Sequence, residues 1–136
     1  MPHNILVIDD EERIREVIIQ KLSQSGYQLH QAENGKEGVK VVKRECIDLV
    51  ITDILMPEQE GIETVLYLKK NNPEIKIITI SAPSNNNYLK ITKHLGAERS
   101  FEKPLNLADL ADTVAELLED EYSASDRLPK TMPSDR

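Results

Sequence analysis

The chain has 136 residues, of which 39% are hydrophobic and 30% are charged, and these values suit one compact domain rather than two. Its 24 acidic and 17 basic residues give a formal net charge of -7, which would repel a nucleic-acid backbone, so direct binding of nucleic acid is not expected. Charged residues interrupt every apolar run well before the roughly 20 apolar residues that span a bilayer. Membrane insertion is therefore not expected either.

The N-terminus has none of the features of a secretion signal. Residues 1–4 lack the basic start of such a signal, and the apolar run that follows stops at Asp9 without a small-residue cleavage site. Cys46 is the only cysteine and cannot form an internal disulfide, which fits a reducing compartment. We therefore expect a cytoplasmic protein in which Cys46 is a small buried apolar residue.

Strand-like and helix-like patterns alternate from the start of the chain. Residues 5–8 form a β-branched run that ends at acids, which is typical of a strand buried on both faces. Apolar residues with helical spacing then run from Ile14 to Leu22, and Gly26 closes this helix. Residues 27–32 are more polar and predict an edge strand.

The same alternation continues to the middle of the chain. Asn34 is a suitable N-cap for a second helix, in which Val39 and Val42 keep the helical spacing. Residues 49–52 predict a third strand, and a third helix follows until the sequence Asn71-Asn72-Pro73 breaks its pattern.

Two further strands and two further helices are expected in the second half. Residues 75–80 and, more weakly, 99–102 read as strands, and the segment between them has helical spacing up to Gly96. The apolar residues from Leu107 to Leu118 form the clearest helical stripe in the chain. Short connections between alternating strands and helices imply right-handed crossovers. The expected fold is a doubly wound α/β domain, with a five-stranded parallel sheet flanked by five helices.

This domain is expected to cover residues 1–122. Residues 123–136 are polar and interrupted by proline, so they predict a flexible C-terminal tail or the start of a linker to another part of a longer protein.

Polar residues stand at the carboxyl ends of four predicted strands. Asp9 and Asp10 follow the first strand, Asp53 the third, Ser81 the fourth and Lys103 the fifth. Because these ends meet in one crevice of a parallel sheet, the side chains are expected to lie together. Each one alone has a simpler explanation: an Asp is often a helix cap, a Ser a turn residue and a Lys a surface charge. The combination favours a functional site.

Three carboxylates in one crevice repel one another unless one is protonated or a cation binds between them. Mg²⁺ prefers oxygen ligands and usually takes one or two carboxylates, here those of Asp10 and Asp53. A metal ion and the ammonium group of Lys103 would together balance the charge of a transferring phosphoryl group. The carboxylate of Asp53 would then act as the nucleophile and form a labile acyl phosphate.

These motifs identify a family resemblance. The sequence Ile5-Leu6-Val7-Ile8-Asp9-Asp10-Glu11 is followed by Asp53-Ile54-Leu55-Met56-Pro57 with Gly61, by Ser81-Ala82 and by Lys103-Pro104. In this order they resemble a response regulator receiver domain of two-component systems, the CheY-like superfamily with its flavodoxin-like fold, over about residues 3–121.

The resemblance implies a role for each site residue. Asp53 would be the phosphorylation site, with Ser81 and Lys103 bound to phosphoryl oxygens and a cis bond between Lys103 and Pro104. Mg²⁺ would be the cofactor, with Mn²⁺ as a substitute. Its ligands would be the carboxylates of Asp10 and Asp53, the backbone carbonyl of Leu55 and, through water, Asp9.

The resemblance also implies partners. A histidine kinase or a histidine phosphotransfer protein would supply the phosphoryl group and dock near the first helix and the loop after the fifth strand. The residues expected at this docking surface are Arg13, Ile14, Val17, Pro104, Leu105 and Asn106. The domain would catalyse only its own phosphorylation and dephosphorylation, and would signal to an unidentified downstream protein by a surface change or by onward phosphotransfer.

One position departs from the family pattern. The residue three before the lysine is normally an aromatic that couples to the hydroxyl of the switch residue, here Ser81, but this chain has Ser100 there. Phe101 is next to it, and strand alternation predicts that its ring points to the opposite face, into the core. Transmission through Ser81 is therefore expected to be weaker or to follow another route.

Leu55 and Pro83 occupy the two positions that govern access of water to the reaction centre in this family. Both are apolar and offer no side-chain hydrogen bond to an attacking water, so the acyl phosphate is expected to persist.

Two other functions are compatible with parts of the sequence. A haloacid-dehalogenase-like phosphatase also uses an aspartate nucleophile and Mg²⁺, but it needs a second Asp where this chain has Glu11, and it leaves the Met-Pro and Lys-Pro motifs unexplained. The stronger alternative is a protein interaction module that keeps the receiver fold but does not signal by phosphorylation, which the missing aromatic favours.

Overall fold

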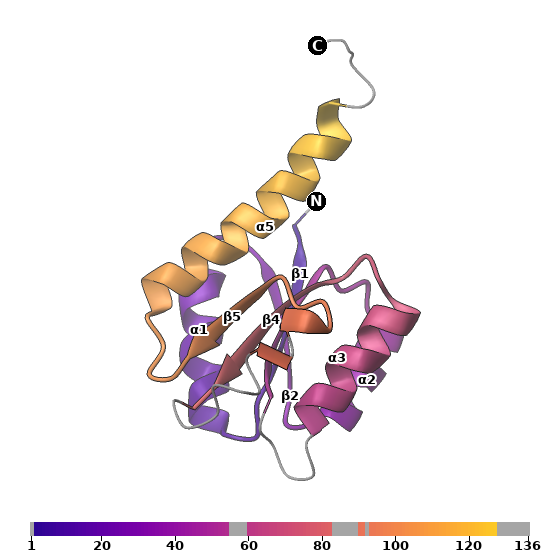
Figure 1. Ribbon diagram of the computed structural model, residues 1–136. Coiled ribbons are helices and arrows are strands. Elements are labelled where there is room, and N and C mark those ends of the chain that lie inside the picture. Colours follow the sequence, from indigo (N-terminus) through magenta and orange to yellow (C-terminus); the bar gives the residue numbers. More distant parts are fainter. Residues whose placement is uncertain (1, 55–59, 83–89, 92, 128–136) are drawn as a thin grey trace.

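The computed structural model describes residues 2–54, 60–82, 90–91 and 93–127, and it contains a parallel sheet (Figure 1). The strands of the sheet are β1 (Asn4–Ile8), β2 (Gln28–Ala32), β3 (Leu49–Asp53), β4 (Lys76–Ser81) and β5 (Arg99–Glu102). Their order is β2-β1-β3-β4-β5. Each strand predicted from the sequence is present, and β2 is an edge strand as expected.

The sheet order reverses between β1 and β3. The chain first places β2 on one side of β1 and then continues with β3, β4 and β5 on the other side. In such a sheet the crevice beyond the carboxyl ends of the strands is the usual place for a functional site. The register pairs Ile8 with Thr52, so Asp9 and Asp53 follow directly at neighbouring strand ends.

The helices cover both faces of the sheet. They are α1 (Glu12–Ser23), α2 (Gly35–Arg44), α3 (Glu60–Asn71) and α5 (Leu107–Arg127). Figure 1 shows α1 and α5 on one face and α2 and α3 on the other. Asn34 caps α2 as predicted, because its side chain accepts a hydrogen bond of 2.8 Å from the backbone N–H of Glu37. The doubly wound α/β class is therefore confirmed.

The number of helices differs from the five expected. Residues 2–54, 60–82, 90–91 and 93–127 hold four helices that can be followed from end to end, and residues 90–91 and 93–94 are also helical. These last residues belong to the segment where the remaining helix was predicted, and the first part of that prediction, including Tyr88, lies outside the described residues.

The last helix is longer than predicted. The expected flexible tail begins at residue 123, but α5 continues to Arg127 and extends past the end of the sheet (Figure 1). Residues 119–127 contain neither proline nor glycine, so nothing in the backbone chemistry stops the helix there, and Pro129 comes only two positions later. The polar composition that predicted a tail is equally compatible with an exposed helix.

The core consists of two layers, one on each face of the sheet. Alternate strand residues point to opposite faces, so Leu6 and Ile8 pack toward α2 and α3 while Ile5 and Val7 pack toward α1 and α5. Phe101 packs against the layer on the α1 and α5 side, as strand alternation predicted. The helices contribute Val41, Val42, Val65 and Leu68 to the first layer and Ile18, Leu22, Leu110 and Val114 to the second.

The prediction that Cys46 is buried is wrong. Its side chain is exposed, because it lies just after the end of α2 and the next residue, Ile47, takes the buried position. Across the part of the chain that the structure describes, no helix is both long and apolar enough to span a membrane.

Candidate phosphoryl-acceptor site

Three carboxylates meet at the carboxyl end of the sheet. Asp9 and Asp10 follow β1, and Asp53 is the last residue of β3. One oxygen atom from each carboxylate lies within 4.8 Å of the others, which is close enough for all three to serve one cation. Asp9 and Asp53 are buried, whereas Asp10 is exposed and faces solvent. The predicted acidic cluster is therefore present in the fold.

Asp9 has a buried carboxylate oxygen that accepts no hydrogen bond from the described residues. Its Oδ1 accepts a hydrogen bond of 2.8 Å from the backbone N–H of Glu11, which orients the carboxylate. Its Oδ2 is buried and has no hydrogen-bond partner among the described residues. Burial raises the pKa of Asp9 from 3.8 to about 6, the hydrogen bond from Glu11 opposes this, and the negative charge of Asp53 adds to it.

A hard divalent cation fits this set of donors. Mg²⁺ takes carboxylate oxygens, keeps several waters and does not need a closed cage of protein ligands. The exposed carboxylate of Asp10 leaves one side of the cluster open to solvent for those waters. A cation would also give a ligand contact to Asp9 Oδ2, which accepts no hydrogen bond from the described residues. The cluster is thus able to hold a divalent metal ion.

Lys103 closes the other side of the cluster. Its Nζ lies 3.2 Å from Oδ2 of Asp53 and 3.7 Å from Oδ2 of Asp9. The backbone holds it there, because the N–H of Lys103 donates a 2.7 Å hydrogen bond to the carbonyl of Ser81. Burial lowers the pKa of Lys103, but attraction to Asp53 and Asp9 outweighs this, so the net pKa is raised. The Lys103–Pro104 peptide bond is cis.

Ser81 lies at the same edge of the sheet. It is the last residue of β4, which lies between β3, where Asp53 is the last residue, and β5, which Lys103 directly follows, and its side chain is fully buried. Its hydroxyl donates a 3.1 Å hydrogen bond to the carbonyl of Ala82. Rotation about one side-chain bond can redirect this hydroxyl, which is the freedom that a residue needs to bind an incoming phosphoryl oxygen.

The predicted docking residues come from α1 and from the segment between β5 and α5. Ile14 from α1 and Leu105 from the loop before α5 both pack, partly buried, against the core layer between α1 and α5. Val17 is 38% exposed, which is high for a large apolar residue. Arg13 and Pro104 are exposed.

Two predicted positions cannot be placed. Leu55, whose carbonyl is the expected metal ligand, and Pro83, which is expected to influence hydrolysis, both lie outside the described residues. The switch position is described: the Oγ of Ser100 lies 2.8 Å from Oγ1 of Thr79 on β4.

Sequence reasoning missed two residues that contact the site. Glu11 lies 3.4 Å from Nζ of Lys103 through its Oε1. Arg15 donates a 2.7 Å hydrogen bond to the backbone carbonyl of Asp9 and a 2.8 Å hydrogen bond to the side chain of Gln31. Glu11 directly follows the acid pair, and Arg15 is four residues later on the same face of the helix, so helical spacing was the available signal.

Comparison with known proteins places the chain in a family. Residues 5–115 match the family described as the response regulator receiver domain. The sporulation initiation phosphotransferase F of Bacillus subtilis is 32% identical over 118 residues, which are 87% of this chain and 95% of that protein. The crystal structure of a CheY-like receiver domain protein from Methanospirillum hungatei superposes with a TM-score of 0.84 at 27% identity, covering 91% of this chain and 99% of that one.

The chain therefore belongs to the response regulator receiver domains, and the resemblance read from its motifs is confirmed. These are regulatory domains of two-component signalling, and the fold and acidic site agree with a phospho-acceptor switch. Some relatives are much longer than this chain: it spans 12% of the sensor kinase CckA of Brucella abortus, at 32% identity. Membership of this family leaves the phosphatase alternative without support.

Proposed function

We propose that Asp53 accepts a phosphoryl group and that the domain signals through this modification. The observation that carries the proposal is the position of Asp53 between the ammonium group of Lys103, 3.2 Å away, and the carboxylates of Asp9 and Asp10. A carboxylate between an ammonium group and a cation site can approach an anionic donor, because the positive charges offset the negative charge of the phosphoryl oxygens.

The chemical step is a displacement at phosphorus. An oxygen atom of Asp53 forms a bond to phosphorus, and the bond between phosphorus and the donor breaks, whether the donor is a phosphohistidine or acetyl phosphate. The leaving group takes the electron pair, and the product is an acyl phosphate on Asp53. Lys103 then pairs with one phosphoryl oxygen, and the hydroxyl of Ser81 donates a hydrogen bond to another.

The cofactor of this step is proposed to be Mg²⁺, with Mn²⁺ as a substitute. Asp10 and Asp53 would bind it directly, Asp9 through a water molecule, and the carbonyl of Leu55 would complete the ligands from the protein. When bound, the ion neutralises charge on the phosphoryl oxygens. The Oδ2 of Asp9, which accepts no hydrogen bond from the described residues, and the raised pKa of this residue support a cation at this position.

The phosphoryl donor is proposed to be a histidine kinase or a histidine phosphotransfer protein. It would dock on Arg13, Ile14 and Val17 of α1, which begins just after Asp9 and Asp10, and on Pro104 and Leu105, which follow Lys103. The Bacillus relative of similar length is named a phosphotransferase, which supports onward transfer in a relay as one route for the signal. A downstream protein would be the other route. A cytoplasmic location is part of this proposal.

The alternative is an interaction module that is not phosphorylated, and one observation favours it: Ser100 stands where the family has an aromatic switch residue. The two functions separate in one experiment. The protein is incubated with acetyl phosphate and Mg²⁺, and intact-mass spectrometry measures the added phosphoryl group in wild type, Asp53→Ala and Asp53→Asn.

Phosphorylation of Asp53 predicts a mass gain in wild type that is absent from both variants and from wild type treated with a chelator. Asp112→Asn, which removes an exposed carboxylate on α5, is the matched control and should be modified like wild type. An unmodified wild type, or equal modification of the Asp53 variants, would reject the proposal and leave the interaction module as the function.

A further inference from the structure

We propose that Glu11 is a positioning residue for the acidic site, because it offers Lys103 an alternative carboxylate. The ammonium group can then leave Asp53 and Asp9 to a divalent cation while it stays at the edge of the site. This inference rests on the function proposed above, because that proposal identifies the acidic cluster as the cation site. It adds Glu11, to which that proposal gave no role.

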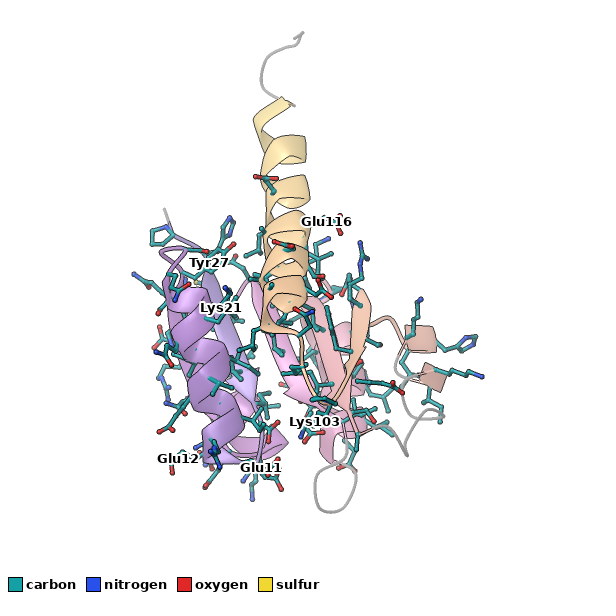
Figure 2. The ribbon with its side chains drawn as sticks, turned by 90° about the vertical axis from the view of Figure 1, so that its left-hand side faces the viewer. Glu11, Glu12, Lys21, Tyr27, Lys103 and Glu116 are labelled. Carbon is teal, nitrogen blue, oxygen red and sulfur yellow. The ribbon has the colours of Figure 1, made fainter. Side chains whose placement is uncertain are left out.

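The ion pairs of Lys103 divide into two kinds. Two of them, to Asp53 at 3.2 Å and to Asp9 at 3.7 Å, involve the same carboxylates that form the cation cluster. The third, to Glu11 at 3.4 Å, involves a carboxylate outside that cluster. Figure 2 shows Glu11 and Lys103 at the same end of the molecule, Glu11 beside the start of α1 and Lys103 at the end of the sheet.

The first two ion pairs compete with cation binding. A lysine side chain is charged at neutral pH. Its ammonium group therefore contacts two of the carboxylates that a divalent ion needs, and it repels that ion while it stays beside them. The side chains of Asp9 and Asp53 are only 1% and 6% exposed, so water screens this repulsion poorly. Lys103 has to shift for the cluster to fill.

Glu11 is placed to receive the shifted group. The side chain of Glu11 is 62% exposed and that of Lys103 is 23% exposed, so Glu11 lies on the side of Lys103 that faces solvent. The backbone of Glu11 is fixed, because its N–H donates to Asp9 and its carbonyl accepts from the N–H of Arg15. A fixed backbone with an exposed carboxylate keeps an acceptor near Lys103 without adding a buried charge.

The test compares two variants that each lose one negative charge. Glu11→Gln removes the carboxylate that pairs with Lys103. Glu12→Gln removes the neighbouring carboxylate at the start of α1, and within the described residues Glu12 makes no ion pair with Lys103. Mg²⁺ affinity is measured by calorimetric titration at about 0.15 M ionic strength, where distant charges are screened. We expect Glu11→Gln to weaken Mg²⁺ binding about two- to fivefold more than Glu12→Gln does, the range of a partly exposed ion pair.

The role of the lysine is tested in the same series. Lys103→Met removes the competing ammonium group, so it should strengthen Mg²⁺ binding, and in its background Glu11→Gln and Glu12→Gln should have the same effect. Proton NMR spectra with dispersed amide signals show that each variant is folded before the titration.

Three results would overturn the inference: equal effects of the two glutamine variants with Lys103 present, a difference between them that persists in Lys103→Met, or weaker Mg²⁺ binding by Lys103→Met alone. Because the measured quantity is binding rather than phosphorylation, a failure here is distinct from a failure of Asp53 to accept a phosphoryl group.

Discussion

The hydroxyl groups of Thr79 and Ser100 lie 2.8 Å apart and join β4 to β5. Thr79 is fully buried, directly opposite Ser100 in the strand register, and two residues before Ser81 on the same face of the sheet. Ser100 stands at the position where the family resemblance predicts an aromatic switch residue. A hydrogen-bonded pair therefore connects β4 to β5 beside Ser81.

This hydroxyl pair should contribute to stability. Ser100→Ala and Thr79→Val are each expected to lower the free energy of unfolding by about 1 kcal/mol, the usual net value of a buried hydrogen bond. Since both changes remove the same hydrogen bond, the double variant should lose less than the sum of the two. Urea unfolding of the four proteins gives the coupling energy, and strictly additive losses would show that the pair is not energetically coupled.

The same pair should carry part of the response to phosphorylation. With Mg²⁺ and beryllofluoride, a phosphoryl mimic, we expect amide NMR signals to shift in wild type for residues 90–91 and 99–102, and to shift less in Ser100→Ala. The reason is that a movement of Ser81 toward the mimic displaces β4, and the bond from Thr79 passes this displacement to β5. Spectra of wild type that are nearly identical with and without the mimic in these residues would contradict any switch there.

Stability without metal should fall as the pH rises through the range in which Asp9 ionises. The pKa of Asp9 is about 6 in the folded protein, against 3.8 for an aspartate in an unfolded chain. Between these pH values the folded state therefore binds more protons than the unfolded state does. Stability is then highest below about pH 4 with respect to this group, decreases toward pH 6, and stays lower above it, by about 2 to 3 kcal/mol. Thermal unfolding in a chelator across this range measures the slope.

Asp9→Asn is the control for that slope. This variant should remove most of the change in stability between pH 4 and 6, because that change comes from the raised pKa of Asp9. It should also raise the stability of the metal-free protein at neutral pH. Added Mg²⁺ should stabilise wild type above pH 6 much more than this variant, because binding to the folded state alone adds to its stability. A variant as pH-dependent as wild type would place the titrating group elsewhere.

Gly61 should not tolerate a side chain. A Cβ atom at this position would overlap the Cα of Ile54 and the carbonyl oxygen of Asp53, which are backbone atoms of the proposed acceptor residue and its neighbour. Gly61→Ala is therefore expected to cost about 2 kcal/mol or more of unfolding free energy despite the better helix propensity of alanine, and to slow phosphorylation.

Gly38→Ala is the matched comparison for Gly61. It lies in α2, and its added Cβ would meet side-chain atoms of Ile8 and Leu6 rather than backbone atoms. Its loss of stability should be smaller, with phosphorylation unchanged. Equal losses for both variants would show that contact with the backbone of Asp53 is not what excludes a side chain at Gly61.

The acyl phosphate should persist for minutes rather than seconds. Leu55 and Pro83 have apolar side chains, so neither can position an attacking water by a hydrogen bond. Leu55→Asn introduces a group that can, and should shorten the lifetime. Release of phosphate from the purified phosphorylated domain measures both rates, and a wild-type half-life of a few seconds would refute the prediction.

The sequence alone was sufficient for the strands, the doubly wound class and the acid, hydroxyl and lysine positions, because these depend on short apolar runs and on the residues that end them. Asp9, Asp53, Ser81 and Lys103 each follow or close a strand, and parallel strands bring such ends together whatever the details of packing. The end of α5 was misplaced because polar residues occur in exposed helices and in tails alike.

Only the tertiary structure decided how these residues act on one another. Glu11 and Lys103 are 92 positions apart, and Thr79 and Ser100 are 21 apart, so neither contact follows from local spacing. The burial that raises the pKa of Asp9 and the closeness of Gly61 to Asp53 likewise depend on how the helices pack on the sheet. A periodic pattern specifies which face of an element is apolar, whereas distances between side chains are set by the packing of several elements at once.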